Sequence, residues 1–91
     1  MTKNETKLTT ALEALALADP DDGVLRKKLA QMALAAKDYK KARQWATETI
    51  YCDVMDVDGH RMLAEANEAL GRKADAEFER ETLKKLEAFN K

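Results

Sequence analysis

The stretch Lys37-Asp38-Tyr39-Lys40-Lys41-Ala42 decides how this chain is expected to fold, because it joins two segments that each carry helical periodicity. Asp38 suits a helix N-cap, since its carboxylate can accept hydrogen bonds from the free N–H groups of a first turn. Small and apolar residues then recur at the spacing of one helical face: Tyr39, Ala42, Ala46, Thr49 and Ile50. The stretch therefore predicts the turn of a helical hairpin.

Composition places the whole chain in the all-α class. Of its 91 residues 45 % are apolar and 36 % charged, with only 3 glycines and 1 proline. Such a profile favours helices and argues against disorder or a sandwich of short strands. Apolar periodicity predicts five antiparallel helices, at about residues 5–18, 23–36, 39–53, 58–70 and 73–89, with Gly71 as a left-handed cap.

Charge, termini and cysteine content exclude several classes. A net charge of -1 lacks the basic excess that drives general binding to nucleic acid or membrane surfaces. No apolar run is long enough to span a bilayer, and the N-terminus lacks the hydrophobic segment of a signal peptide. Cys52 is the only cysteine, so an internal disulfide is excluded. We expect a cytoplasmic protein or a piece of a longer one.

An internal repeat separates this chain from an ordinary bundle. The shift that carries Lys37 onto Gly71, at the two inter-helix turns, also carries Pro20 onto Val54, at the two inter-repeat turns. We call this shift the repeat period. It also superimposes identical residues: Leu29 on Leu63, Ala30 on Ala64, Ala35 on Ala69, and Ala42 on Ala76. When the sequence is shifted by one repeat period, the first predicted helix aligns with the second helix of a hairpin. The first helix therefore corresponds to half a repeat.

This pattern resembles a degenerate tetratricopeptide repeat, whose period is about 34 residues, over nearly the whole chain. Leu29 and Leu63 match the family's leucine, Ala42 and Ala76 its alanine, and Tyr39 its turn aromatic. The departures are at six positions. Ala30 and Ala64 replace a glycine with another small residue, Arg26 and His60 replace an aromatic, and Ala33 and Asn67 replace a tyrosine. The resemblance implies one domain over residues 1–91, a short right-handed superhelix with a half repeat at about 5–19 and full repeats at 23–56 and 57–90. A related helical repeat or a plain five-helix bundle is the alternative.

The two ends of the predicted superhelix differ. Arg80 and Lys84 replace Ala46 and Ile50 of the preceding repeat, so the last helix has the polar face of a terminal cap. The leucines of the first helix instead predict a face without a partner helix. That face indicates the C-terminal part of a longer protein or a homodimer formed through the first helix.

Neither catalysis nor metal binding is expected. His60 and Cys52 lack a nucleophile or an orienting group in any recognisable spacing, and we expect a packed histidine and a buried or half-buried thiol. The acidic turn resembles a calcium loop at four positions, namely Asp56, Asp58, Gly59 and Glu65, but Val54 occupies the first ligand position. We therefore predict no enzyme, no metal and no cofactor.

The family resemblance implies a concave groove lined by the first helix of each hairpin. The corresponding residues of this chain form a stripe: Lys27, Gln31, Leu34, Arg61, Glu65 and Glu68. We predict a non-catalytic interaction or scaffold module that binds a peptide or partner domain there, with an ordinary solvated face as the alternative reading of the stripe.

A second function class depends on uneven charge. Between Val24 and Thr47 seven basic residues accompany a single acid, whereas six acids and one base follow up to Ala69. The basic patch from Arg26 to Arg43 offers an alternative function, the binding of an anionic ligand or nucleic acid. The net charge and the scarcity of interleaved aromatics argue against it. Attraction between the two neighbouring hairpins is the simpler explanation.

Overall fold

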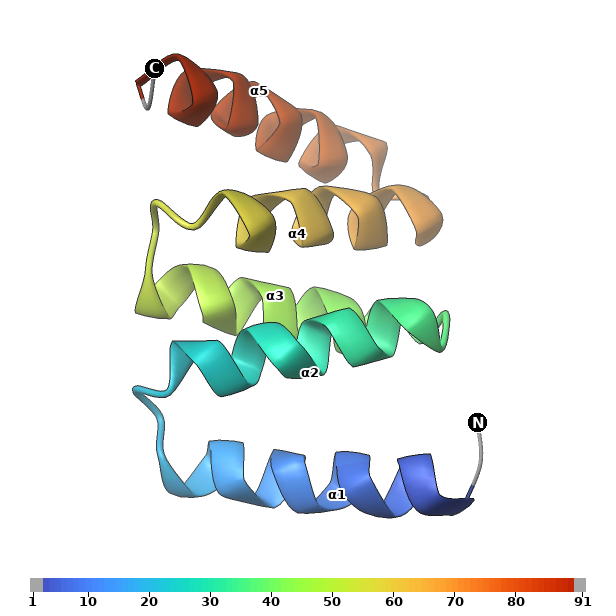
Figure 1. The fold of residues 1–91 in the computed structure, drawn as a ribbon. Coiled ribbons are helices and arrows are strands. Elements are labelled where there is room, and N and C mark those ends of the chain that lie inside the picture. Colours follow the sequence, from blue (N-terminus) through green and yellow to red (C-terminus); the bar gives the residue numbers. More distant parts are fainter. Residues whose placement is uncertain (1–2, 90–91) are drawn as a thin grey trace.

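The computed structural model describes residues 3–89 and contains five α-helices joined by short turns (Figure 1). The helices are α1 (Lys3–Ala18), α2 (Gly23–Ala35), α3 (Tyr39–Cys52), α4 (Val57–Ala69) and α5 (Lys73–Phe89). They form an elongated stack with α1 at one end and α5 at the other. Residues 3–89 include no strand, so the all-α prediction is confirmed, and the predicted boundaries are correct to within two residues. None of the described helices is long and apolar enough to cross a membrane.

Aspartate side chains begin three of the helices. Asp22, Asp38 and Asp56 are the N-caps of α2, α3 and α4, and each carboxylate accepts a hydrogen bond from the backbone N–H three residues later. These bonds satisfy donors that the helix leaves free in its first turn. The predicted N-cap at Asp38 is therefore confirmed.

Both hairpins use the same turn between their helices. Lys37 and Gly71 have positive φ angles of 60° and 78°. The residues that follow them donate backbone hydrogen bonds across the turn, from Asp38 to the carbonyl of Ala33 and from Arg72 to that of Asn67. This is the pattern of a Schellman motif, in which a left-handed residue ends the helix. The left-handed cap predicted at Gly71 is confirmed, and Lys37 adopts the same conformation one repeat period earlier.

The core lies between α2, α3 and α4 and is built largely of small residues. Its main cluster comprises Ala16, Leu29, Ala30, Trp45, Ala46, Met62 and Leu63. Gly59 allows α4 to approach α3 closely, because a Cβ there would lie 3.2 Å from Cγ2 of Thr49. A second cluster joins Ala33, Ala42 and Ala66 where the two hairpins meet.

Helix α1 is the least integrated helix of the stack. Its backbone approaches only that of α2 among the described helices, with Leu12 and Ala16 turned inward. Leu8 and Leu15 are 50 % and 58 % exposed. The predicted leucine face is thus divided between an inward edge and an exposed edge that no described residue covers.

Candidate interaction surface

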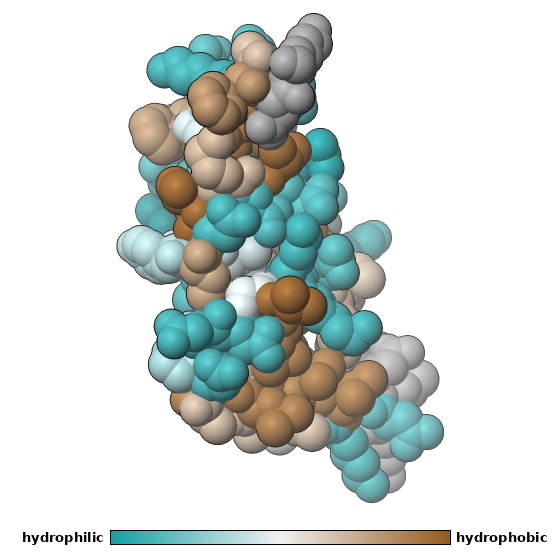
Figure 2. All heavy atoms as spheres, turned by 60° about the vertical axis from the view of Figure 1, so that its left-hand side comes forward, coloured by the Kyte–Doolittle hydropathy of each residue, from teal (hydrophilic) through white to brown (hydrophobic). Residues whose placement is uncertain are grey.

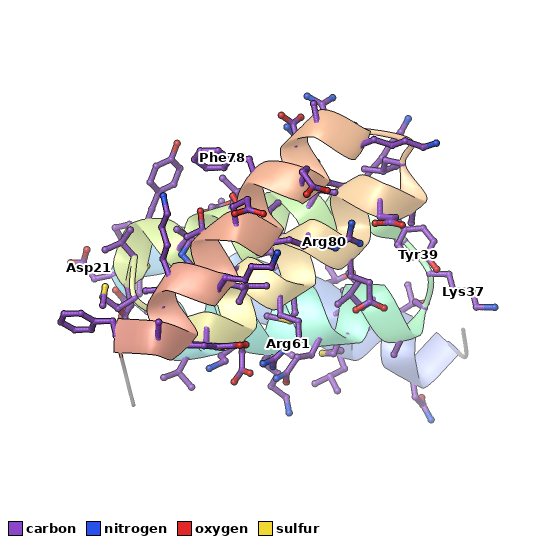
Figure 3. The ribbon with its side chains drawn as sticks, turned by 90° about the horizontal axis from the view of Figure 1, so that it is seen from above. Asp21, Lys37, Tyr39, Arg61, Phe78 and Arg80 are labelled. Carbon is purple, nitrogen blue, oxygen red and sulfur yellow. The ribbon has the colours of Figure 1, made fainter. Side chains whose placement is uncertain are left out.

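A shallow hollow of about 410 Å³ lies at the α5 end of the stack. Residues from three helices line it: Tyr39, Arg61, Ala64, Glu65, Glu68, Ala69, Arg80 and Leu83. Arg61, Arg80 and Tyr39 lie on one side of α5, whereas Phe78 points away on the other (Figure 3). We call this set of eight lining residues the α4/α5 hollow.

The internal repeat explains where the α4/α5 hollow comes from. Ala64, Arg80 and Leu83 lie one repeat period after three residues of the first hairpin, namely Ala30, Ala46 and Thr49. Those three are buried where α4 packs onto α2 and α3. The hollow is therefore the surface of the second hairpin that corresponds to the surface of the first hairpin on which α4 packs.

The hollow combines an apolar floor with a charged rim. Alanines and Leu83 form the floor. On the rim, Arg61 pairs with Asp58 at 2.8 Å, and Arg80 pairs with Glu68. Glu65 is exposed and makes no ion pair with any residue in 3–89. The carboxylate of Glu65 is thus the rim charge that is available to a ligand.

The structure brings three of the six predicted groove residues together in the hollow, namely Arg61, Glu65 and Glu68. Gln31 is exposed on α2, and Leu34 is half-buried against both core clusters. Tyr39 and Leu83 were not predicted as site residues, and Arg80 was interpreted only as part of a cap. Shifting the buried positions of α3 by one period would have indicated Arg80 and Leu83.

Lys27, the remaining predicted groove residue, is held by the acidic turn before α4. Its Nζ atom lies 3.1 Å from carboxylate oxygens of both Asp56 and Asp58. The hydrogen bond to Asp58 raises the pKa of Lys27, and the same bond lowers the pKa of Asp58. The two carboxylates that resembled calcium ligands therefore hold an ammonium group, and Asp56 also caps α4. The attraction between hairpins that the sequence indicated is present at this point.

Several members of the Arg26–Arg43 basic patch are committed to contacts within the chain. Arg26 is only 4 % exposed, Lys41 pairs with Glu13 of α1 at 3.4 Å, and Arg43 donates to the side chain of Asn67 at 2.8 Å. Three lysines of the patch are exposed without an ion pair in the described chain: Lys28, Lys37 and Lys40. The cations available to an anionic ligand are thus fewer than the sequence suggests.

Arg26 is a buried cation that connects three helices. Its guanidinium donates to the carbonyl oxygen of Ala16 at 2.7 Å and to that of Asp19 at 2.8 Å, and so caps the C-terminus of α1. It also pairs with Glu48 at 3.1 Å and lies 6.0 Å from the ring centroid of Trp45, both on α3. A buried cation with this many acceptors stabilises the fold, because each acceptor would lose the hydrogen bond that Arg26 donates to it.

His60 occupies the equivalent place in the second hairpin. Its Nδ1 lies 2.5 Å from Oε2 of Glu79 on α5, and its Nε2 lies 2.7 Å from the carbonyl oxygen of Val54. The residue is 4 % exposed, which agrees with the packed histidine that we expected. Cys52 differs from expectation, because its thiol is exposed near the end of α3, beyond the core.

Comparison with known proteins identifies no relative: no family model, no curated protein and no solved structure matches the chain. The tetratricopeptide resemblance and the right-handed superhelix therefore stay predictions. Assignment of a function depends on the geometry of the chain itself.

Proposed function

We propose that this chain is a tetratricopeptide-like interaction module that holds a helical segment of a partner protein in the α4/α5 hollow. The observation that carries the proposal is that this hollow corresponds to the surface of the first hairpin on which α4 packs. A surface equivalent to one that already binds a helix suits another helix, because ridges of side chains pack into matching grooves. Recognition of a helix in an apolar groove is a common mode of peptide binding.

The charges on the rim indicate which helix would suit the hollow. The floor of Ala64, Ala69 and Leu83 accommodates one apolar side chain. Arg61 and Arg80 already have acidic partners, whereas Glu65 has none within residues 3–89. The partner helix should therefore present an apolar anchor with a lysine or arginine one turn away. The Arg80–Glu68 pair joins α5 to α4 within the hollow, and a bound helix would have to pack against it or displace it. We therefore expect modest affinity, on the order of 1–100 µM.

A library of amphipathic helical peptides, displayed on phage and selected on the immobilised 91-residue chain, tests the proposal. Selected peptides should carry an apolar residue beside a basic one, and calorimetry should give weaker binding to the variants Tyr39→Ala and Glu65→Lys. Matched controls are Tyr51→Ala and Glu77→Lys, which change the same residue types at exposed positions outside the hollow. Equal losses in the control variants, or peptides that shift only amide resonances away from α4 and α5, would contradict the proposal.

A further inference from the structure

The uncovered edge of α1 carries an ordered apolar pattern. Leu8, Ala11, Leu15 and Ala18 follow one another at spacings of three, four and three residues, which places them along one face of a helix. All four are exposed, with Leu8 at 50 % and Leu15 at 58 %. In Figure 2 hydrophobic side chains gather over α1 at the lower end of the molecule. A contiguous apolar surface of this kind marks an interaction site more often than an ordinary solvated face.

We propose that this face pairs with α1 of a second copy of the chain, antiparallel across a two-fold axis. Large leucines and small alanines alternate along this face, so two antiparallel copies present complementary sizes to each other. In one antiparallel register Leu8 lies on the partner's Ala18, and Ala11 lies on the partner's Leu15. Each large side chain then meets a small one, so the two helices can approach closely. A parallel pair would oppose leucine with leucine and alanine with alanine.

Charge favours the same orientation. The antiparallel register opposes the two helix dipoles, so the positive N-terminal end of each α1 lies beside the negative C-terminal end of its partner. A parallel pair would place like helix ends together.

The size of the interface sets the expected affinity. The face offers two leucines and two alanines per copy, so the pair would bury on the order of 1,000 Å² or less in total, at or below the lower limit for a specific interface. We therefore expect dissociation in the micromolar range. The α4/α5 hollow lies at the opposite end of the stack, so dimerisation neither requires nor blocks peptide binding there.

Sedimentation equilibrium of the whole chain tests the proposal, over about 5–500 µM so that a micromolar dimer is visible. The variant Ala11→Glu places a charge at the middle of the face on an exposed helical position, and it should raise the dissociation constant at least tenfold. Ala74→Glu makes the same change at an exposed position of α5 and should leave the constant unchanged. Circular dichroism checks that both variants stay helical. A monomer throughout the range, or equal constants for wild type and Ala11→Glu, overturns the proposal.

Cysteine cross-linking tests the orientation. In a Cys52→Ser background, Leu8→Cys and Ala18→Cys chains are prepared separately, mixed and oxidised slowly. The antiparallel pair brings the two different cysteines together, because disulfides need Cα atoms within about 7 Å. With equal amounts of the two chains, mixed disulfides should therefore make up clearly more than half of the cross-linked product, the share that random pairing gives. A mixed share of half or less would overturn the antiparallel arrangement.

Discussion

Arg26 and His60 lie one repeat period apart and make the same kind of contact in successive hairpins. Each is 4 % exposed, bonds to a carbonyl of the turn before its helix, and pairs with a glutamate on the next helix. The glutamates are Glu48 and Glu79. A basic side chain therefore connects each hairpin to the turn that precedes it, at positions where the family resemblance leads one to expect an aromatic residue.

Removal of the Arg26 guanidinium should release α1. Arg26→Met removes the donor to the carbonyl of Ala16 and one of the donors to the carbonyl of Asp19 and to half-buried Glu48. It should lower the free energy of unfolding by about 2–4 kcal/mol. Hydrogen exchange should accelerate first in α1. Arg72→Met is the matched control, since this exposed arginine pairs with Asp75 on the surface and that pair should contribute about 0–1 kcal/mol. Comparable losses in the two variants would show that Arg26 does not have this role.

The pair formed by His60 and Glu79 should behave as a unit. His60→Phe and Glu79→Leu each leave one buried polar partner unsatisfied, and each should cost about 2–4 kcal/mol of unfolding free energy. The double variant removes both polar groups and should lose clearly less than the sum of the single losses. Urea unfolding of the four proteins measures the coupling. Additive losses would show that the two side chains do not stabilise each other.

Substitutions at the two left-handed turn residues should change the stability of the chain in opposite directions. Lys37→Gly relieves the strain of a side chain at φ 60° and should stabilise the chain by up to about 1 kcal/mol. Gly71→Ala introduces that strain at φ 78°, although no atom lies within 4 Å of the added Cβ, and should destabilise by about 1 kcal/mol. Thermal unfolding of both variants checks the signs. A stabilised Gly71→Ala variant would contradict the left-handed turn.

Small size at Ala42 should be essential to the hairpin. Ala42 is completely buried, next to Ala33 and Ala66, whereas Lys40 is exposed two residues earlier. Ala42→Trp should overpack this contact and cost about 1–3 kcal/mol or more. Lys40→Trp, with the same new side chain in solvent, should change little. Equal melting temperatures would mean that the repeat register is wrong.

Acid should weaken the contact between the hairpins at Lys27. The hydrogen bond from Lys27 lowers the pKa of Asp58, so the folded chain binds this proton less tightly than the unfolded chain does. The resulting stabilisation is complete above the ordinary carboxyl pKa of about 4 and disappears as the pH falls through the lowered value. The free energy of unfolding should fall between pH 5 and pH 3, a range that spans the ordinary carboxyl pKa of about 4. Asp58→Asn should make this fall smaller. Glu77→Gln, a change at an exposed carboxylate on α5, should leave that fall unchanged.

Local patterns were sufficient to predict the helices and turns. The aspartate caps, the left-handed Gly71 and the apolar periodicity each involve residues within a few positions of one another, so they can be recognised in the sequence. The candidate site was predicted only in part. Arg61, Glu65 and Glu68 lie in one hollow, but Leu34 packs against the core and Lys27 is bound by Asp56 and Asp58.

The sequence by itself determined the number of helices, where each begins and ends, and the recurrence of the hairpin turn after one repeat period. Only the tertiary structure decided which polar residues are buried. Arg26 meets Glu48 across 22 positions and His60 meets Glu79 across 19, and no local propensity reports such distant partners. It also decided that one edge of α1 stays open while α4 covers α2 and α3. Burial depends on which surfaces meet after the helices have packed, whereas helix boundaries depend on hydrogen bonds within a few residues of the chain.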